Sequence, residues 1–282
     1  MKKLLRADFF RIVFAIVATI GLAKLTTASD KKDARVTQVI KDVRLLSSKT
    51  GAHPAAVNDT VREGQAVRTG GDSRAELTFT DQTLARLGAN TVFSYGQGAK
   101  DFDLASGAVL MCVPKESGTV RINTAAATAA VTGGMAMTEA HAKSWTKIIV
   151  IEGQACVKLK KGVGGISGEP CLTLLPGDAL LLPPGATRLP ERQHVNLEKI
   201  TRTALLINDF DKKLPNWALH LILTSVDAQQ GGPPPRGGYT DPTGIGPISE
   251  KNAANSPTPA GIEPPPGSPP PSERQIRHRG RP

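Results

Sequence analysis

Short stretches of alternating apolar and polar residues dominate the middle of this chain. Between residues 61 and 182 they are separated by glycine-rich turns, and the run Ala75–Phe79 (AELTF) shows the alternation most clearly. A period of two places every second side chain on the same face of a strand. The pattern therefore predicts an all-β fold of many short strands, without the helices that βαβ units require.

The side chains available for the core of this fold are mostly small. Aromatic residues make up 4% of the sequence, and the predicted strands are rich in Ala, Val, Thr and Leu. Two closely stacked sheets can be filled by such side chains, whereas a wide barrel leaves more interior to fill. We therefore predict a stacked two-sheet β-roll or sandwich.

A helical pattern follows the last predicted strand. Asn196 is suited to the N-cap position, and the apolar residues after it are spaced by three or four positions: Leu197, Ile200, Ala204, Ile207 and Phe210. We predict one C-terminal amphipathic helix that covers the sheet or packs on residues 219–226. A helix that docks on a partner is the alternative.

The two ends of the chain differ from its middle. Lys2, Lys3 and Arg6 precede the apolar run Ile12–Ala23. This run has the length of a signal-peptide core, whereas a bilayer-spanning helix needs about 20 residues. We predict an exported protein with a signal peptide at residues 1–28, and keep an uncleaved membrane anchor and a buried N-terminal helix as alternatives. The last segment, residues 231–282, contains 14 of the 22 prolines and is predicted to be a disordered Pro/Gly-rich tail.

These boundaries divide the rest of the chain into three segments. Residues 30–60 form an N-terminal extended segment, residues 61–184 the β domain, and residues 185–230 the helix with its packing segment. Most of the net charge of +10 lies in residues 1–28 and 231–282, and the middle carries only +4. This charge is too small to indicate a nucleic-acid partner. The basic end of the tail offers contact with anionic lipid or cell-wall polymer, although a solvated tail is the simpler interpretation.

Two cysteines are placed for a disulfide. A glycine-rich loop separates the strand patterns around Cys156 and Cys171, so a hairpin centred near Gly164 puts the two thiols opposite one another. Opposite residues on paired strands are close enough to be bridged, and an exported protein meets an oxidising compartment. Two reduced thiols in the sheet are the alternative.

Trp145 is the candidate interface residue. It lies in a polar loop pattern, HAKSWTK, and tryptophan is enriched among the residues that dominate binding energy at interfaces. Packing of the indole over the adjacent strands is the alternative.

The sequence contains no arrangement of residues typical of catalysis or metal binding. It lacks a nucleophile elbow, an H-E-x-x-H motif and a Walker lysine loop, and its five histidines have no zinc spacing. We predict no enzymatic activity, no cofactor and no metal. A carbohydrate-active site would require carboxylates that converge in one groove; its first candidates are Asp101, Asp103, Glu139 and Glu152.

A series of short motifs occurs in an order typical of one family. The motifs are Thr69–Gly70, Ser73–Leu77 (SRAEL), Asp81, Arg86–Gly88 (RLG), Phe102–Gly107, Thr124–Gly133, Glu152–Gly153 and Pro176–Gly177. Together they resemble the FecR domain from Val61 to Pro184. Two positions depart from the family: Gln82 replaces a glycine that is common there, and Gly133–Gly134 stands where Gly-Thr is frequent. A β-turn can absorb both changes.

The resemblance implies a cell-envelope domain that works through protein contact. FecR-type regulators have a cytoplasmic anti-sigma region and a membrane span before this domain, whereas eleven residues precede the apolar run here. We therefore do not carry the anti-sigma activity over. We expect a bacterial exported protein, periplasmic or envelope-associated, that contacts an envelope protein for signal sensing or scaffolding. A structural cell-surface or polymer-binding protein is the alternative, and a carbohydrate-active β-fold enzyme is the least favoured.

Overall fold

The computed structural model describes residues 33–47, 51–96, 100–141, 143–161, 165–166, 170–236 and 238–240. The chain divides into two units, Met1–Ser249 and Glu250–Pro282, and all described residues lie in the first. The predicted signal peptide and most of the predicted tail lie outside the described residues. The elements in chain order are β1 (Ala34–Ile40), β2 (Val43–Ser47), β3 (Gly51–Pro54), β4 (Thr60–Val61), β5 (Gln65–Thr69), β6 (Arg74–Phe79), β7 (Leu84–Leu87), β8 (Val92–Tyr95), β9 (Asp101–Val113), the 3-10 helix η1 (Lys115–Ser117), β10 (Thr119–Asn123), β11 (Ala127–His141), β12 (Trp145–Lys161), β13 (Gly165–Ile166), β14 (Leu172–Leu174), β15 (Asp178–Leu182), β16 (Gln193–His194), α2 (Leu197–Thr203), α3 (Leu205–Asn208) and α4 (Asn216–Gly231).

The strands form one connected sheet that folds over into two layers. The long strands β9, β11 and β12 run through both layers and pair with different neighbours in their two halves. The first layer has the order β4-β1-β6-β7-β9-β11-β12-β15-β16, and the second has the order β3-β2-β5-β8-β9-β10-β11-β12-β14. Strand β10 is parallel to β9. This arrangement confirms the predicted all-β, two-layer fold.

The long strands change layer where glycines allow close approach. At Gly107, with φ +85°, a Cβ atom would collide with Thr91. In the same way, a Cβ at Gly134 would collide with the carbonyl oxygen of Glu152, and one at Gly153 with the backbone of Gly133. Only glycine fits such positions, so these residues allow the β11–β12 hairpin to bend from one layer to the other.

A core of small aliphatic residues fills the space between the layers, with aromatic rings at one end. Phe102 lies 5.0 Å from Phe79, 5.2 Å from Phe93 and 5.3 Å from Tyr95, measured between ring centroids. Along β6, Ala75, Leu77 and Phe79 all enter this core, as the alternation in the sequence predicts. Few rings are needed because most of the interior is filled by Ala, Val and Leu.

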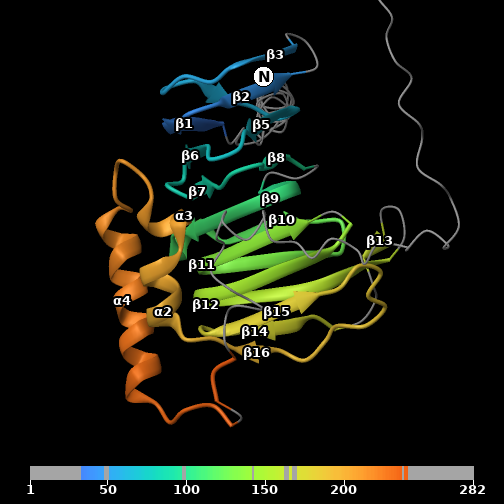
Figure 1. Cartoon of the computed structure of the whole chain (residues 1–282), viewed down its shortest axis with the longest axis vertical. Helices are drawn as coiled ribbons and strands as arrows, with labels where there is room; N and C mark the ends of the chain where they lie inside the picture. Colours follow the sequence, from blue (N-terminus) through green and yellow to red (C-terminus); the bar gives the residue numbers. More distant parts are fainter. Residues whose placement is uncertain are drawn as a thin grey trace, which may run out of the picture. The chain divides into compact units, whose positions relative to one another are not determined.

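Helices form a third layer on the outer face of the first layer of strands. Figure 1 shows α2, α3 and α4 together on one side of the strands. Their apolar side chains pack on Leu110, Met137 and Ile149 of the sheet, and α4 buries Ala218 and Ile222 one turn apart. Among the described residues, no helix has both the length and the apolar composition needed to cross a bilayer.

The helical layer differs in detail from the single predicted helix. Asn196 does cap α2, since its side chain accepts a hydrogen bond of 2.8 Å from the amide of Lys199. Ala204 then takes an extended conformation, with φ −70° and ψ 119°, and separates α2 from α3. Helix α4 escaped prediction because residues 217–223 (WALHLIL) are apolar at nearly every position, which hides the helical period.

A buried arginine joins the third layer to the sheet. The Arg86 side chain is fully buried, and its Nε donates to Oε2 of Glu76 at 2.8 Å. Its terminal nitrogens donate to the main-chain oxygens of Ile207 at 2.9 Å and Lys212 at 2.6 Å. The guanidinium also lies 4.2 Å from the ring centroid of Phe210. The charge of Arg86 is therefore paired with Glu76, and its terminal nitrogens are satisfied by main-chain oxygens of residues 206–212.

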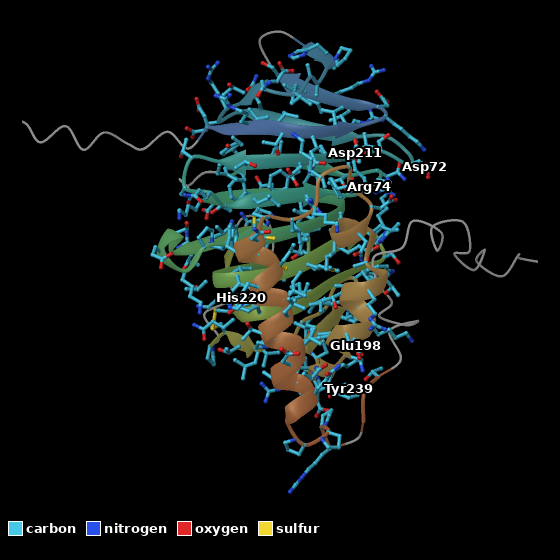
Figure 2. All side chains as sticks on the ribbon, turned by 90° about the vertical axis from the view of Figure 1, so that its left-hand side faces the viewer. Asp72, Arg74, Glu198, Asp211, His220 and Tyr239 are labelled. Carbon is cyan, nitrogen blue, oxygen red and sulfur yellow. A yellow bond between two sulfur atoms is a disulfide. The ribbon has the colours of Figure 1, made fainter. Side chains whose placement is uncertain are left out.

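Two further side chains extend this contact. Gln38 accepts a hydrogen bond from the Lys212 amide at 2.8 Å and donates to the carbonyl oxygen of the same residue at 3.3 Å. Arg74 forms an ion pair of 2.7 Å with Asp209. Figure 2 looks onto the helical layer and labels Arg74 near Asp211 of this segment. We call Gln38, Arg74 and Arg86, together with Glu76, which pairs with Arg86, the carbonyl clamp, because most contacts of this group to residues 206–212 are to the main chain.

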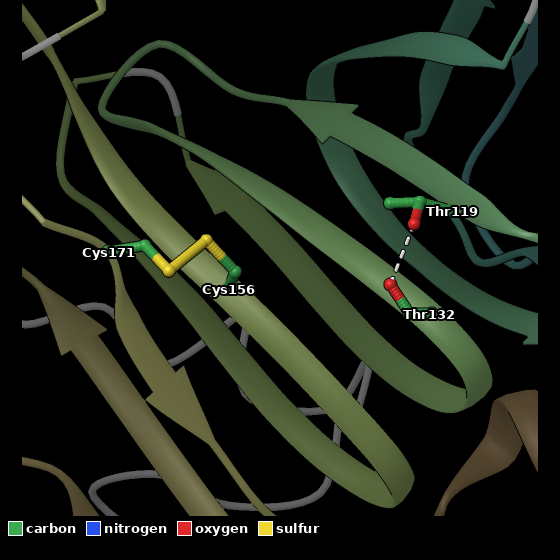
Figure 3. Close-up of a disulfide and its surroundings, with 4 residues drawn as sticks. All are labelled: Thr119, Thr132, Cys156 and Cys171. Carbon is green, nitrogen blue, oxygen red and sulfur yellow. Dashed lines mark hydrogen bonds between the residues drawn. A yellow bond between two sulfur atoms is a disulfide. The ribbon is translucent and has the colours of Figure 1, made fainter.

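The outer face of the second layer has a different character. Its outward side chains are mostly half-buried or exposed, and many are short and polar, such as Ser94, Thr132 and Thr173. Hydrogen bonds join some of them across strands, for example Thr119 and Thr132 at 2.8 Å (Figure 3). We call this surface the open face.

Candidate protein-interaction site

The candidate site lies at the end of the β11–β12 hairpin. His141 and Trp145 are the last paired residues of the two strands, and the amide of Ser144 closes the turn by donating to the carbonyl oxygen of His141. Their side chains fall on the same face as Met137 and Ile149, which lie under the helical layer. The indole therefore lies on the face of the first layer that the helices cover, at the turn end of the β11–β12 hairpin.

The side chains around Trp145 hold the indole in one orientation. The His141 ring lies 4.2 Å from the indole, measured between centroids, and Nζ of Lys147 lies 4.9 Å from the indole centroid. Glu139 connects these two neighbours, because its carboxylate is 2.9 Å from Nε2 of His141 and 3.1 Å from Nζ of Lys147. We call these four residues the Trp145 cluster.

The Trp145 cluster combines a fixed aromatic surface with partial exposure. Lys147 is buried, with 6% of its side chain exposed, whereas the His141 side chain is 40% exposed and Trp145 is half-buried. A tryptophan that is fixed by its neighbours loses little further freedom on binding, which favours its use as an anchor. The indole thus packs beside His141 and Lys147 and keeps part of its surface exposed, and its use as an interface residue stays a prediction.

The carboxylates considered for catalysis are spread over different faces. Asp101 and Asp103 lie on the open face, where Asp101 pairs with Arg121 at 3.0 Å. Glu139 belongs to the Trp145 cluster on the first sheet. Glu152 lies at the bend of β12, and burial raises the pKa of its carboxyl despite the nearby charge of Lys115. The four do not converge in one groove, and the described residues contain no group of three His, Cys, Asp or Glu side chains that could hold a metal ion.

The cysteines are also located by the structure. Cys156 on β12 is joined to Cys171, directly before β14, by a disulfide with a Cα–Cα distance of 5.4 Å (Figure 3). The strand register differs from the predicted hairpin, because Cys156 pairs with Thr173 and not with Cys171. Strands β13 and β14 pair with β12 in different registers, which a simple hairpin count cannot foresee. Cys112 is fully buried in the core, and burial raises the pKa of its thiol to about 12, so it is unreactive.

Several structurally central residues were not singled out by their chemistry in the sequence. Glu76 and Arg86 occur in the SRAEL and RLG motifs, yet nothing in the sequence indicated that they pair with one another or that Arg86 contacts residues 206–212. Gly177 of the late Pro-Gly motif lies against the side chain of Gln229, which donates to the carbonyl oxygen of Val195 at 3.0 Å. The only available signal was the presence of polar residues within strands that are otherwise buried.

Solved structures and protein families give further points of comparison. A crystal structure of a Parabacteroides distasonis protein, described provisionally as an anti-sigma factor, is similar over 51% of this chain, with 18% identity and a TM-score of 0.41. A second crystal structure with the same description, from the same organism, is similar over 58% of this chain and 75% of its own length, with 17% identity and a TM-score of 0.41. The present chain covers 64% of the first of these proteins. No curated protein matches this chain.

The family comparison agrees with the order of motifs in the sequence. The model of the family described as FecR protein matches residues 65–156, from the start of β5 to the middle of β12. This range includes the SRAEL and RLG motifs, whereas Pro176–Gly177 and the helical layer lie beyond it. Residues 65–156 of this chain therefore form a FecR domain.

Proposed function

We propose that this protein is a non-enzymatic, signal-sensing regulatory protein that acts by contact with another protein of the cell envelope. The observation that carries the proposal is the match of residues 65–156 to the FecR family. FecR-type domains are regulatory modules, and the dispersed carboxylates of this chain agree with a role without catalysis.

We propose the Trp145 cluster as the contact point. Trp145 is half-buried at the end of a hairpin, and His141 and Lys147 fix its ring. Interfaces favour such a fixed aromatic side chain with polar neighbours. The cluster lies outside the carbonyl clamp, so a partner could bind it without displacing the helical layer.

Export to the envelope is part of the same proposal. It is supported by the disulfide between Cys156 and Cys171, since disulfides persist mainly in oxidising compartments. The basic and apolar pattern of residues 1–23 supports it as well.

The test is site-specific photo-crosslinking in intact bacteria. A photoreactive amino acid is placed at Trp145 in one strain and at Leu223 in another. Leu223 is a suitable control because it is an exposed apolar residue, 61% exposed, on α4. We expect one dominant envelope-protein adduct from position 145 and none from position 223. Equal adducts from both positions, or adducts only with cytoplasmic proteins, would contradict the proposal.

The mature N-terminus is measured on the same purified protein. A chain that begins near Ser29 agrees with cleavage after export. An intact Met1 in the cytoplasmic fraction would overturn the envelope part of the proposal.

A further inference from the structure

We infer that Arg44 and Arg68 on the open face bind a carboxylate of an extended acidic segment in a protein partner. The inference rests on the proposed function, because it names the chemistry of the partner that such a regulatory protein would contact. It concerns a second surface, on the opposite layer from the Trp145 cluster.

Arg44 and Arg68 lie directly opposite one another on strands β2 and β5, and both are exposed. Directly opposite residues have Cβ atoms about 4.5–5.5 Å apart, and like charges in such pairs destabilise a sheet. The two arginines are therefore not explained by the stability of the sheet. At this separation, two guanidinium groups can donate to the same carboxylate.

The local acidic groups leave one of these arginines without a counter-ion. Nε of Arg44 is 3.2 Å from Oδ1 of Asp42, and both side chains are more than half exposed. Within the part of the chain that the structure describes, no carboxylate or hydrogen-bond acceptor holds the side chain of Arg68. An incoming carboxylate can thus supply a partner that the fold does not.

A shallow hollow continues from the arginine pair along the same strands. It has a volume of about 410 Å³, and its lining includes Leu46, Ala52, Ala66, Ser94 and Tyr95. Leu46 and Ala66 are the next pair on this face after Arg44 and Arg68, so the two charges stand at one end of the hollow. The small side chains leave room for an extended peptide to lie against this face, where it would contact side chains, because β2 and β5 are already paired along both edges.

The distribution of charge favours a peptide over a membrane surface. An anionic bilayer attracts broad clusters of basic residues. The open face instead carries Asp101 and Asp103 on β9, two strands away from Arg68, and Asp103 pairs with Ser94 of the hollow. The other basic residues of this face, Arg121, Lys158 and Lys160, lie on β10 and β12, beyond this acidic pair. The face is therefore not uniformly basic, and the positive charge beside the hollow matches one acidic segment.

The test uses the full-length protein and a fluorescein-labelled peptide with alternating glutamate and small apolar residues. A control peptide has lysine in place of every glutamate. Binding is measured by fluorescence anisotropy for the wild type, for Arg44→Glu/Arg68→Glu and for Arg188→Glu/Lys213→Glu. The last variant makes the same change in net charge at two exposed positions away from the hollow. Thermal unfolding verifies that all three proteins are folded, and Arg44→Gln/Arg68→Gln replaces the first variant if it is not.

We expect the acidic peptide to bind the wild type, and binding to weaken about tenfold or more in Arg44→Glu/Arg68→Glu, because charge-assisted bidentate contacts are lost. Binding to the Arg188→Glu/Lys213→Glu variant should be unchanged. An equal loss of affinity in both variants would show that binding depends only on the net charge of the protein. Equal binding of the lysine peptide would show that the site does not select acidic groups. Either result would overturn the inference.

Competition experiments distinguish a peptide carboxylate from a small oxyanion or a lipid headgroup as the ligand of the arginine pair. Inorganic phosphate that displaces the peptide at equal concentration would identify a site for small oxyanions, and arginine-dependent binding to phosphatidylglycerol vesicles without peptide binding would identify a lipid site. Either result overturns the inference. If the acidic peptide binds through the arginines but position 145 gives no envelope adduct, the arginine site stands and the proposed function fails.

Discussion

Two arginines on opposite layers of the molecule show how differently its two outer faces are built. Under the helical layer, Arg86 and Glu76 form an ion pair whose side chains are 0% and 7% exposed. On the open face, the Arg121 and Asp101 side chains are 55% and 22% exposed. The buried guanidinium needs main-chain carbonyls because no water can reach it. The exposed guanidinium has water, so its protein contacts remain exchangeable. The covered face therefore specifies the fold, and the open face retains capacity for binding.

The sharpest way to break this comparison is to remove one arginine from each face. We expect Arg86→Met to lower the free energy of unfolding by about 3–5 kcal/mol, because it leaves the Glu76 carboxylate without its buried counter-ion and the carbonyl oxygen of Ile207 without its arginine donor. Arg121→Met should cost less than about 1 kcal/mol, as is usual for exposed pairs. Denaturant unfolding measures both. Equal costs would mean that burial does not distinguish the two faces.

The double variant Arg86→Met/Glu76→Gln refines this test. It removes the uncompensated carboxylate, so we expect it to recover part of the loss. A double variant no more stable than Arg86→Met would show that the lost carbonyl contacts, and not the buried charge, dominate the cost.

The disulfide is expected to stabilise the layer that carries the open face, as the Arg86–Glu76 pair stabilises the covered face. Cys156 and Cys171 are 15 residues apart in the chain. A crosslink of this length stabilises a protein by about 3 kcal/mol in the chain-entropy model. We expect Cys156→Ser/Cys171→Ser to lose about 2–3 kcal/mol, and reductant to produce a similar loss in the wild type. Identical unfolding of the variant and the untreated wild type would show that the thiols are reduced.

An ion pair at the rim, where the two layers meet, gives a pH-dependent effect. Asp81 in the β6–β7 turn lies 2.9 Å from Nζ of Lys100, just before β9. Burial alone would raise the pKa of Asp81, but the hydrogen bonds from Lys100 and the Thr83 amide outweigh it and lower the pKa from 3.8 to about 2. The carboxylate therefore adds stability that is fully present above pH 3.8 and is lost as the pH falls through 2.

We accordingly expect Asp81→Asn to cost about 1–2 kcal/mol at neutral pH. Urea unfolding between pH 2 and pH 7 measures the difference between the variant and the wild type. The difference should shrink towards zero at the acidic end of this range. A difference that stays constant with pH would mean that the charge of Asp81 contributes nothing to the link between the layers.

The smallest effect is expected at the neighbouring Gln82. This residue has φ +65°, a conformation that costs a side chain about 1–2 kcal/mol and glycine nothing. Because glycine also increases the freedom of the unfolded chain, Gln82→Gly should stabilise the protein by only about 0.5–1 kcal/mol. Asn58→Gly is the control, since Asn58 has φ +77° but asparagine tolerates this region better. A larger gain at Asn58 would contradict the argument.

The sequence was most informative where local patterns decide the structure. Alternation along Ala75–Phe79 predicted a strand with one face in the core, and Asn196 was recognised as an N-cap. The motif order predicted the FecR domain that the family comparison confirms. Helix α4 and the break at Ala204 were missed, because a uniformly apolar segment has no visible period and the break depends on packing against the sheet.

The candidate sites were less predictable, because they depend on contacts between distant residues. Trp145 was found from its residue type, but its neighbours Glu139 and Lys147 become partners only through the register of β11 and β12. Arg44 and Arg68 are 24 positions apart in the sequence, and only the pairing of β2 with β5 makes them adjacent. The sequence alone gives no register for strands that are separated by turns of irregular length.

The carbonyl clamp has a consequence for how this protein can evolve. Gln38 and Arg86 recognise backbone groups of Lys212 and Ile207, which every amino acid except proline presents alike. The side chain of the exposed Lys212 can therefore change among relatives without loss of these contacts, whereas an insertion or deletion between Ile207 and Lys212 would move the carbonyls out of reach. Related sequences should vary at position 212 and keep the length of this segment.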